Sequence, residues 1–175
     1  TVVGAVQVQG RHRDAIASAQ ACRRLGQRAG QRAVVQERRR PARVERGVEL
    51  VKNFCRRFRV PNEHRDLAVL TARFHAHCHK IAELRPATVV DTLEALDAFR
   101  RPERVDLFVT ACEADFRGRH GSEDKPYPQA GLFRSVFAAA RAVDTSAIAA
   151  AGGQGPDIGA RIREARIDAV RQVLS

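Results

Sequence analysis

The sequence predicts an all-α protein, an irregular bundle of about six to seven helices that follows a poorly structured basic N-terminal arm. From Val44 onward, apolar residues recur with the 3.6-residue period of helices that bury one face. No stretch after that residue alternates apolar and polar residues as a half-buried strand does. The preceding residues are rich in Arg, Ala, Val, Gln and Gly and contain no Phe, Tyr or Trp, so they cannot build much core.

Two apolar stripes predict the first two helices of the bundle. One stripe runs over residues 44–58 and ends before Pro61, which together with the capping residue Asn62 starts the next helix. The second stripe runs over residues 67–81 and stops near Leu84. The two helices are therefore expected to be joined by a short turn.

Five further helices are expected after this pair. Pro86 and Pro102 each open one, because proline fits the first turn of a helix, where its missing N–H costs nothing. A polar loop over residues 117–128 precedes another, and Asp144 caps a short sixth helix. The glycine-rich run 152–156 then leads into the last.

The eight phenylalanines all fall on these apolar stripes, so we expect them in the core. Tyr127 would then be the only aromatic side chain in a loop, which argues against a platform on which RNA bases stack. Cys55, Cys78 and Cys112 also fall on apolar helix faces and are expected to be buried free thiols, as is typical of a reducing compartment. The apolar stretches are too short to cross a bilayer, so we expect a cytoplasmic protein.

The charge of the chain is uneven. Its net charge is +11, and residues 1–46 hold eleven arginines against three acidic residues. One interpretation is an arginine-rich arm that binds RNA phosphates, with a helix over residues 15–25. The alternative, which we favour, is that residues 1–45 are disordered or non-native sequence produced by a reading-frame error, because Arg, Ala, Gly and Gln with few acids are typical of a GC-rich gene read in the wrong frame.

The densest cluster of metal-binding residue types is the run from His75 to His79. On a helix, His75, Cys78 and His79 share one arc of about 100°, so they could ligate zinc or another transition metal. No carboxylate accompanies them. The simpler interpretation, which we favour, is that the histidines line a cleft while Cys78 lies in the core.

A mixed-charge segment follows the fourth helix. Glu113 and Asp115 are two residues apart, so a helix projects them in different directions and they are poorly suited to paired acid–base chemistry. We expect Asp115, Arg117 and Arg119 to be structural, with the acids paired to the arginines and bracing the loop.

The glycine-rich run before the last helix could bind a phosphate, because a helix N-terminus favours anions. A tRNA phosphate contact is therefore a hypothesis for Gly153, Gly155, Arg161 and Arg163. The alternative is a plain interhelical loop.

Several motifs together resemble a known family. They are FRVPNEHRDLA at residues 58–68, LRPAT at 84–88, FRRPER at 99–104 and EADFRGR at 113–119. In order and spacing they are similar to the carboxy-terminal half of the long bacterial CCA-adding enzymes, which are tRNA nucleotidyltransferases of the poly(A) polymerase family. The similarity covers roughly residues 46–173.

The resemblance implies an enzyme that adds CCA to tRNA 3′ ends from CTP and ATP with magnesium. It also implies an attached HD-type phosphohydrolase domain for 2′,3′-cyclic and monoester phosphates, with nickel or zinc as its metal. The residues of the transferase site have no counterpart in this chain. The first His-Asp motif of the HD domain is also absent, and the later one corresponds to His75-Ala76. No catalytic residue is therefore assigned, and His75 is a remnant of the motif.

The predicted organisation has three parts: residues 1–45, an incomplete HD-type domain at 46–100, and a helical body and tail at 101–175. Without the opening helices of the family, the apolar faces of residues 48–58 and 67–81 would be uncovered. We expect this portion to contribute tRNA docking or dimer contacts and to be inactive alone. The alternatives are a metal-dependent phosphohydrolase and a purely structural oligomerisation domain.

Overall fold

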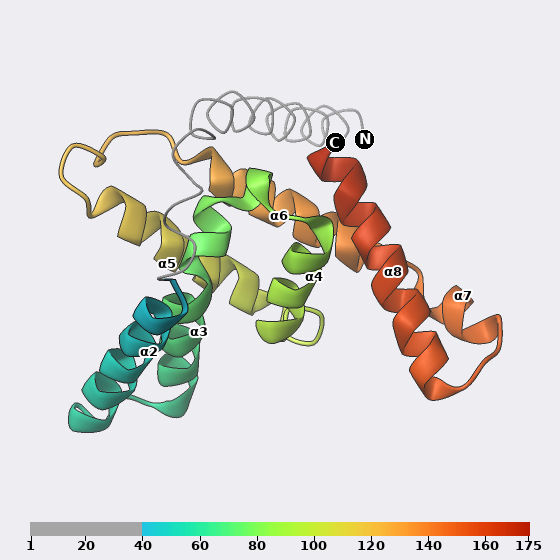
Figure 1. Ribbon diagram of the computed structural model, residues 1–175, viewed down its shortest axis with the longest axis horizontal. Coiled ribbons are helices and arrows are strands. Elements are labelled where there is room, and N and C mark those ends of the chain that lie inside the picture. Colours follow the sequence, from blue (N-terminus) through green and yellow to red (C-terminus); the bar gives the residue numbers. More distant parts are fainter. Residues whose placement is uncertain (1–39) are drawn as a thin grey trace, which may run out of the picture.

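The protein is described here by a computed structural model that covers residues 40–175, with side chains from Val44 onward. Within this range all regular structure is helical (Figure 1). The elements in chain order are α2 (Arg40–Arg57), α3 (Asn62–His79), η2 (Ile81–Glu83), α4 (Pro86–Ala95), α5 (Glu103–Arg117), α6 (Pro128–Arg141), α7 (Thr145–Ala150) and α8 (Gly155–Leu174), where η2 is a short 3-10 helix. The predicted all-α class is confirmed. Residues 1–39 of the predicted arm, with the helix expected over residues 15–25, lie outside the described residues.

The helices begin at the proline and capping residues of the sequence. Pro86 and Pro128 lie in the first turns of α4 and α6. The carboxylate of Asp144 accepts hydrogen bonds from the backbone N–H groups of Ser146 and Ala147, both at 3.0 Å, and so caps α7. Helix α2 begins at Arg40, which places the predicted boundary at residue 45 inside a helix.

The core lies where α4, α5, α6 and α8 meet. Its largest fully buried side chains include Ile81, Leu93, Leu96, Phe108 and Phe133. The rings of Phe108 on α5 and Phe133 on α6 pack with centroids 5.4 Å apart. Residues on both sides of the predicted boundary at 100/101 belong to this one core.

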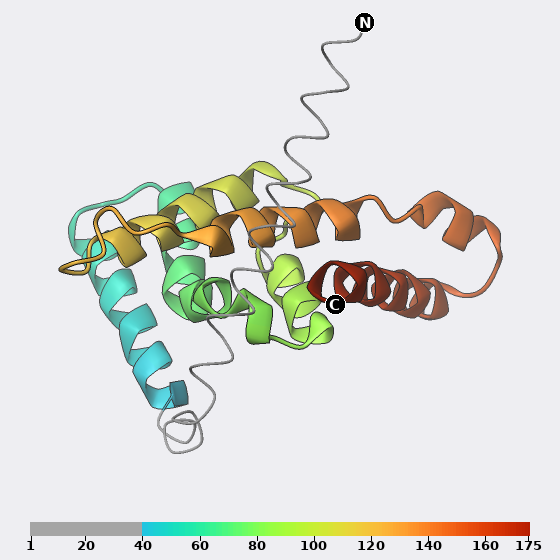
Figure 2. The ribbon, with the colours of Figure 1, turned by 90° about the horizontal axis from the view of Figure 1, so that it is seen from above.

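The two ends of the described structure differ. Helices α2 and α3 lie side by side and project from one end of the body, while α7 and the start of α8 lie at the other end (Figures 1 and 2). Helix α8 packs along α4 and α6. None of the helices in residues 40–175 is long and apolar enough to span a membrane.

Two phenylalanines that were expected in the core are exposed. Phe54 and Phe58 each leave 59% of their surface accessible, and Leu50 on the same helix leaves 65%. Helix α2 packs mainly on α3, which buries Val48 and Cys55 and leaves the opposite face without a neighbour among residues 40–175. The inward prediction was therefore wrong for these two rings. Of the two apolar faces expected to be uncovered, the one on α2 is exposed among the described residues, whereas Leu67, Leu70 and Phe74 of the other are packed against the core.

The turn between α2 and α3 contains a strained residue. Arg59 has a φ of 50°, in the left-handed region that favours glycine. The N–H of Val60 donates to the carbonyl of Cys55 at 2.9 Å, and the N–H of Arg59 donates to that of Arg56 at 3.3 Å. These two bonds form a Schellman motif with an arginine where glycine is usual.

Candidate nucleic-acid interface

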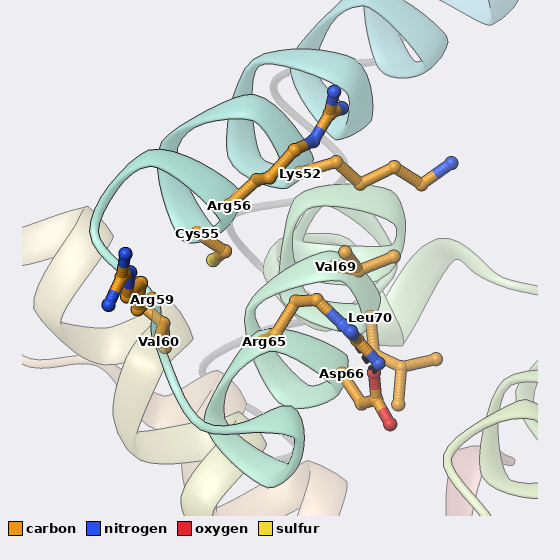
Figure 3. Close-up of a pocket in the computed structure, with 9 residues that line it drawn as sticks. All are labelled: Lys52, Cys55, Arg56, Arg59, Val60, Arg65, Asp66, Val69 and Leu70. Atoms are coloured by element: carbon orange, nitrogen blue, oxygen red, sulfur yellow. Dashed lines mark hydrogen bonds and ion pairs between the residues drawn. The ribbon is translucent and has the colours of Figure 1, made fainter.

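A groove of about 710 Å³ lies between the second half of α2 and the first half of α3 (Figure 3). Its lining residues are Lys52, Cys55, Arg56, Arg59, Val60, Arg65, Asp66, Val69 and Leu70. Four of these nine carry a positive charge and one carries a negative charge. The groove therefore combines basic and apolar lining residues.

Local structure places these cations around the groove. Lys52 and Arg56 are four residues apart, so they lie one above the other on α2. Arg65 projects from the first turns of α3, and the Schellman turn sets the direction of Arg59. The carboxyl end of α2 also favours positive charge, since its last carbonyls are partly negative.

Two of these four cations are paired with a carboxylate of the described residues, and two are not. Arg65 donates to a carboxylate oxygen of Asp66 from Nε and Nη2, at 3.0 and 2.8 Å. Lys52 lies 3.6 Å from a carboxylate of Glu49, and Arg56 donates to the neutral amide oxygen of Asn53 at 2.8 Å. Among the described residues, no carboxylate lies within ion-pair distance of Arg56 or Arg59. Such a surface is suited to phosphate groups.

The histidine cluster has a different geometry from a metal site. Nδ1 of His75 lies 3.1 Å from the backbone carbonyl of Thr71, and the fully buried Cys78 faces the hydroxyl of Tyr127 at 3.4 Å. His79 contacts Tyr127 through Nδ1, at 2.8 Å. In residues 40–175, no three His, Cys, Asp or Glu side chains are grouped so that they could hold a metal ion. The structure therefore does not bring His75, Cys78 and His79 together as ligands.

His75, which the family resemblance identifies with the HD motif, lines an apolar cavity of about 450 Å³ formed by α2, α3 and α5. The cavity is lined by Val51, His64, Leu67, Ala68, Thr71, Ala72, His75, Ala111 and Asp115. His75 is followed by Ala76, whose methyl group cannot ligate a metal. These residues do not fit the transition metal that the family resemblance implies, and the predicted nickel or zinc site finds no support in the described residues.

Asp115 is instead the centre of an ion-pair network. Its carboxylate lies 3.0 Å from Nε2 of His79 and 2.5 Å from the guanidinium of Arg119. Although burial opposes this, hydrogen bonds from His79 and Arg119 hold the pKa of Asp115 below its usual value. Burial lowers the pKa of His79, so the ring favours its neutral form.

The neighbouring pair braces the loop after α5. Arg117 donates to a carboxylate oxygen of Glu113 at 3.0 and 2.8 Å. It also donates to the backbone carbonyl of Glu123 at 3.0 Å, across the loop. Glu113 and Asp115 thus each bind the arginine four residues later, which leaves neither free for acid–base chemistry.

The arginines of the proposed phosphate loop already have partners. Arg161 donates to the backbone carbonyls of Ile148, at 2.9 Å, and of Gly152. Arg163 pairs with Asp91 and so joins α8 to α4. A phosphate near Gly153 and Gly155 would have to compete with these contacts, so this site stays a prediction.

The groove between α2 and α3 was not singled out from the sequence, although a signal was present. Residues 50–62 contain four basic side chains, two phenylalanines and no acidic residue. A basic run interrupted by aromatic residues is typical of a surface that binds nucleic acid. The signal was overlooked because the phenylalanines were assigned to the core.

Residues 40–175 thus form an all-helical bundle with a basic groove between α2 and α3. The chain is 49% identical over 129 residues to the multifunctional CCA protein of Thioalkalivibrio sulfidiphilus and 48% identical over 130 residues to that of Nitrosococcus oceani. It is 45% identical over 135 residues to the multifunctional CCA protein of Halorhodospira halophila. These matches cover 74%, 74% and 77% of this chain.

The matched part of the chain is therefore related to the multifunctional CCA proteins, as the motifs predicted. The chain spans 32% of the length of each of these three relatives. No family model matches the chain, and no solved structure matches it.

Proposed function

We propose that this chain is the tRNA-docking portion of a CCA-adding tRNA nucleotidyltransferase. The relatives are named for CCA, the sequence at tRNA 3′ ends. The observation that carries the proposal is the basic groove between α2 and α3, in which Arg56 and Arg59 have no carboxylate partner among the described residues. Phosphate groups of a tRNA backbone are the ligands that match unpaired guanidinium groups at such a surface.

The chemistry of the proposed enzyme is not assigned to this chain. The family resemblance implies magnesium, ATP and CTP at a transferase site, and no group of three or more His, Cys, Asp or Glu side chains in residues 40–175 could hold a metal ion. The carboxylates of Glu113 and Asp115 are bound to arginines. The proposal for residues 40–175 is therefore confined to docking.

Salt-dependent tRNA binding tests this function. The complete chain should bind tRNA at low salt, and its affinity should fall steeply as salt is raised from 50 to 200 mM, because bound cations release counterions from the RNA. Arg56→Gln and Arg59→Gln should each weaken binding and lower the slope of log affinity against log salt by about 1. Fluorescence anisotropy with labelled tRNA measures both quantities.

Arg171→Gln is the matched control, because it makes the same change on an exposed arginine at the far end of α8. It should affect binding much less than the groove variants. Equal losses in all three variants would show non-specific attraction and would contradict docking in the groove. Undetectable tRNA binding even at low salt would end the proposal.

A further inference from the structure

The exposed face of α2 carries two aromatic rings side by side. Phe54 and Phe58 are one helical turn apart, and their ring centroids lie 4.5 Å from each other with a tilt of 41°. Each ring leaves 59% of its surface accessible. Exposed apolar patches of this kind mark interaction sites, because water contact with large apolar surfaces is unfavourable.

A shallow apolar depression of about 780 Å³ adjoins these rings. Most of its lining residues are apolar, and Leu50, Val51 and Ala68 lie there beside the two rings. It shares Cys55 and Val60 with the basic groove, so the two depressions lie on either side of the same helical hairpin. A flat apolar group could rest on the rings and reach into this depression.

Positive charge connects the aromatic face with the basic groove. The guanidinium of Arg57 lies 5.6 Å from the centroid of the Phe58 ring. At about 100° per residue, Arg57 lies on the outer face of α2 between Arg56, which lines the groove, and Phe54. Arg57 therefore lies on the outer face of α2 between the cations of the groove and the aromatic rings.

The basic and aromatic side chains of this face are suited to one kind of partner. Residues 50–62 contain four basic side chains and no acidic one, so the partner is negatively charged. Two adjacent rings beside those charges match flat apolar groups attached to a charged backbone. Unpaired nucleotides have this combination, whereas the base faces of a duplex are hidden in its stack.

We propose that Phe54 and Phe58 form a stacking platform for unpaired bases of an RNA strand that crosses the outer face of α2. Lys52, Arg56 and Arg57 hold the phosphates of that strand, and the bases stack on the rings. This inference rests on the proposed tRNA docking and goes beyond it, since it names single-stranded nucleotides as the bound segment.

Binding to three short RNA probes tests the platform. The complete chain carrying Phe54→Leu and Phe58→Leu keeps an apolar surface but loses the flat rings. Its affinity for a single-stranded oligonucleotide should fall by at least about fivefold, and its affinity for an abasic strand of the same length should stay unchanged. Duplex RNA should be bound equally by both proteins.

Leu107→Ala is the control for a general effect of exposed apolar residues, because Leu107 on α5 leaves 53% of its surface accessible. It should not change affinity for any probe. A direct readout is also available, since the chain contains no tryptophan. Phe54→Trp should give fluorescence that the single-stranded probe quenches and the abasic strand does not.

The outcomes separate this platform from the docking function. If Arg56→Gln weakens binding while the double leucine variant leaves single-strand affinity unchanged, docking stands and the platform is rejected. If the single-stranded probe fails to quench the tryptophan, the platform is likewise rejected. If the leucine variant alters only the concentration-dependent mass of the protein, the face binds a second copy of the chain and the RNA proposal is overturned.

Discussion

The imidazole of His79 lies 2.8 Å from the hydroxyl of Tyr127, measured from Nδ1 to the phenolic oxygen. The same hydroxyl is 3.4 Å from Sγ of the buried Cys78, and the other ring nitrogen of His79 is 3.0 Å from Asp115. Side chains from α3, α5 and the residue before α6 therefore meet in one polar network beside the core. Tyr127 is largely buried in it, and its ring stacks on Phe116 with centroids 5.0 Å apart.

Tyr127→Phe should reduce the free energy of unfolding by about 1–2 kcal/mol. The substitution keeps the stacked ring and removes the hydroxyl, which leaves Nδ1 of His79 without its partner at a half-buried position. Urea unfolding followed by circular dichroism measures the change. Tyr127→Leu is the companion variant and should cost more, because it also removes ring contacts with Phe116. Equal stability of wild type and Tyr127→Phe would mean that the hydroxyl contributes nothing net.

Acid should destabilise the folded protein as the pH falls from about 7.5 to 5.5. Burial lowers the pKa of His77, with nearby His75 as a second cause, and burial also lowers the pKa of His79. A histidine in the unfolded chain takes up a proton near pH 6.5. The unfolded state therefore binds more protons than the folded state as pH falls through this value, and stability is lost.

Urea unfolding at pH 5.5, 6.5 and 7.5 measures this loss. Replacing both histidines, as His77→Gln with His79→Gln, should flatten the dependence of unfolding free energy on pH, whatever the stability of the variant at pH 7.5. A wild-type stability that rises on acidification in this range would contradict the direction of both pKa shifts.

Arg59→Gly should separate stability from RNA binding. Glycine adopts the left-handed conformation without the steric cost of a Cβ, so stability should rise by up to about 1 kcal/mol. The same change removes one cation from the groove and should weaken tRNA binding. Arg59→Ala removes the same cation but keeps the strain, so it should weaken binding without any gain in stability. Lower stability in the glycine variant would show that the Arg59 side chain stabilises the turn.

Much of the fold could be predicted from local signals. Proline in the first turn of α4 and the Asp144 cap of α7 each determine where a helix starts through residues next to them in the sequence. Both helix starts could therefore be predicted from the sequence alone. The ion pair between Asp115 and Arg119 could be predicted for the same reason, because residues four positions apart on a helix lie on the same face.

The interface could not be predicted in the same way. A period of 3.6 residues shows which face of a helix is apolar, but not whether another element covers it. Phe54 and Phe108 lie on equally regular stripes, yet one is exposed and the other is fully buried. The contact of His79 with Tyr127 joins residues 48 positions apart, so only the packing of α3 against α6 brings them together.

The two phenylalanine environments give a final prediction. Phe108→Ala should reduce the free energy of unfolding by about 3–5 kcal/mol, because it leaves a cavity beside Phe133 at the centre of the core. Phe54→Ala is the matched control and makes the same chemical change on a ring that is 59% exposed. It should cost less than about 1 kcal/mol, since little apolar surface returns to water. Chemical denaturation of both variants measures the difference. Similar losses in the two variants would mean that the Phe54 ring is covered in solution, by a second copy or by residues outside 40–175, and the stacking platform would then be unavailable to RNA in the free protein.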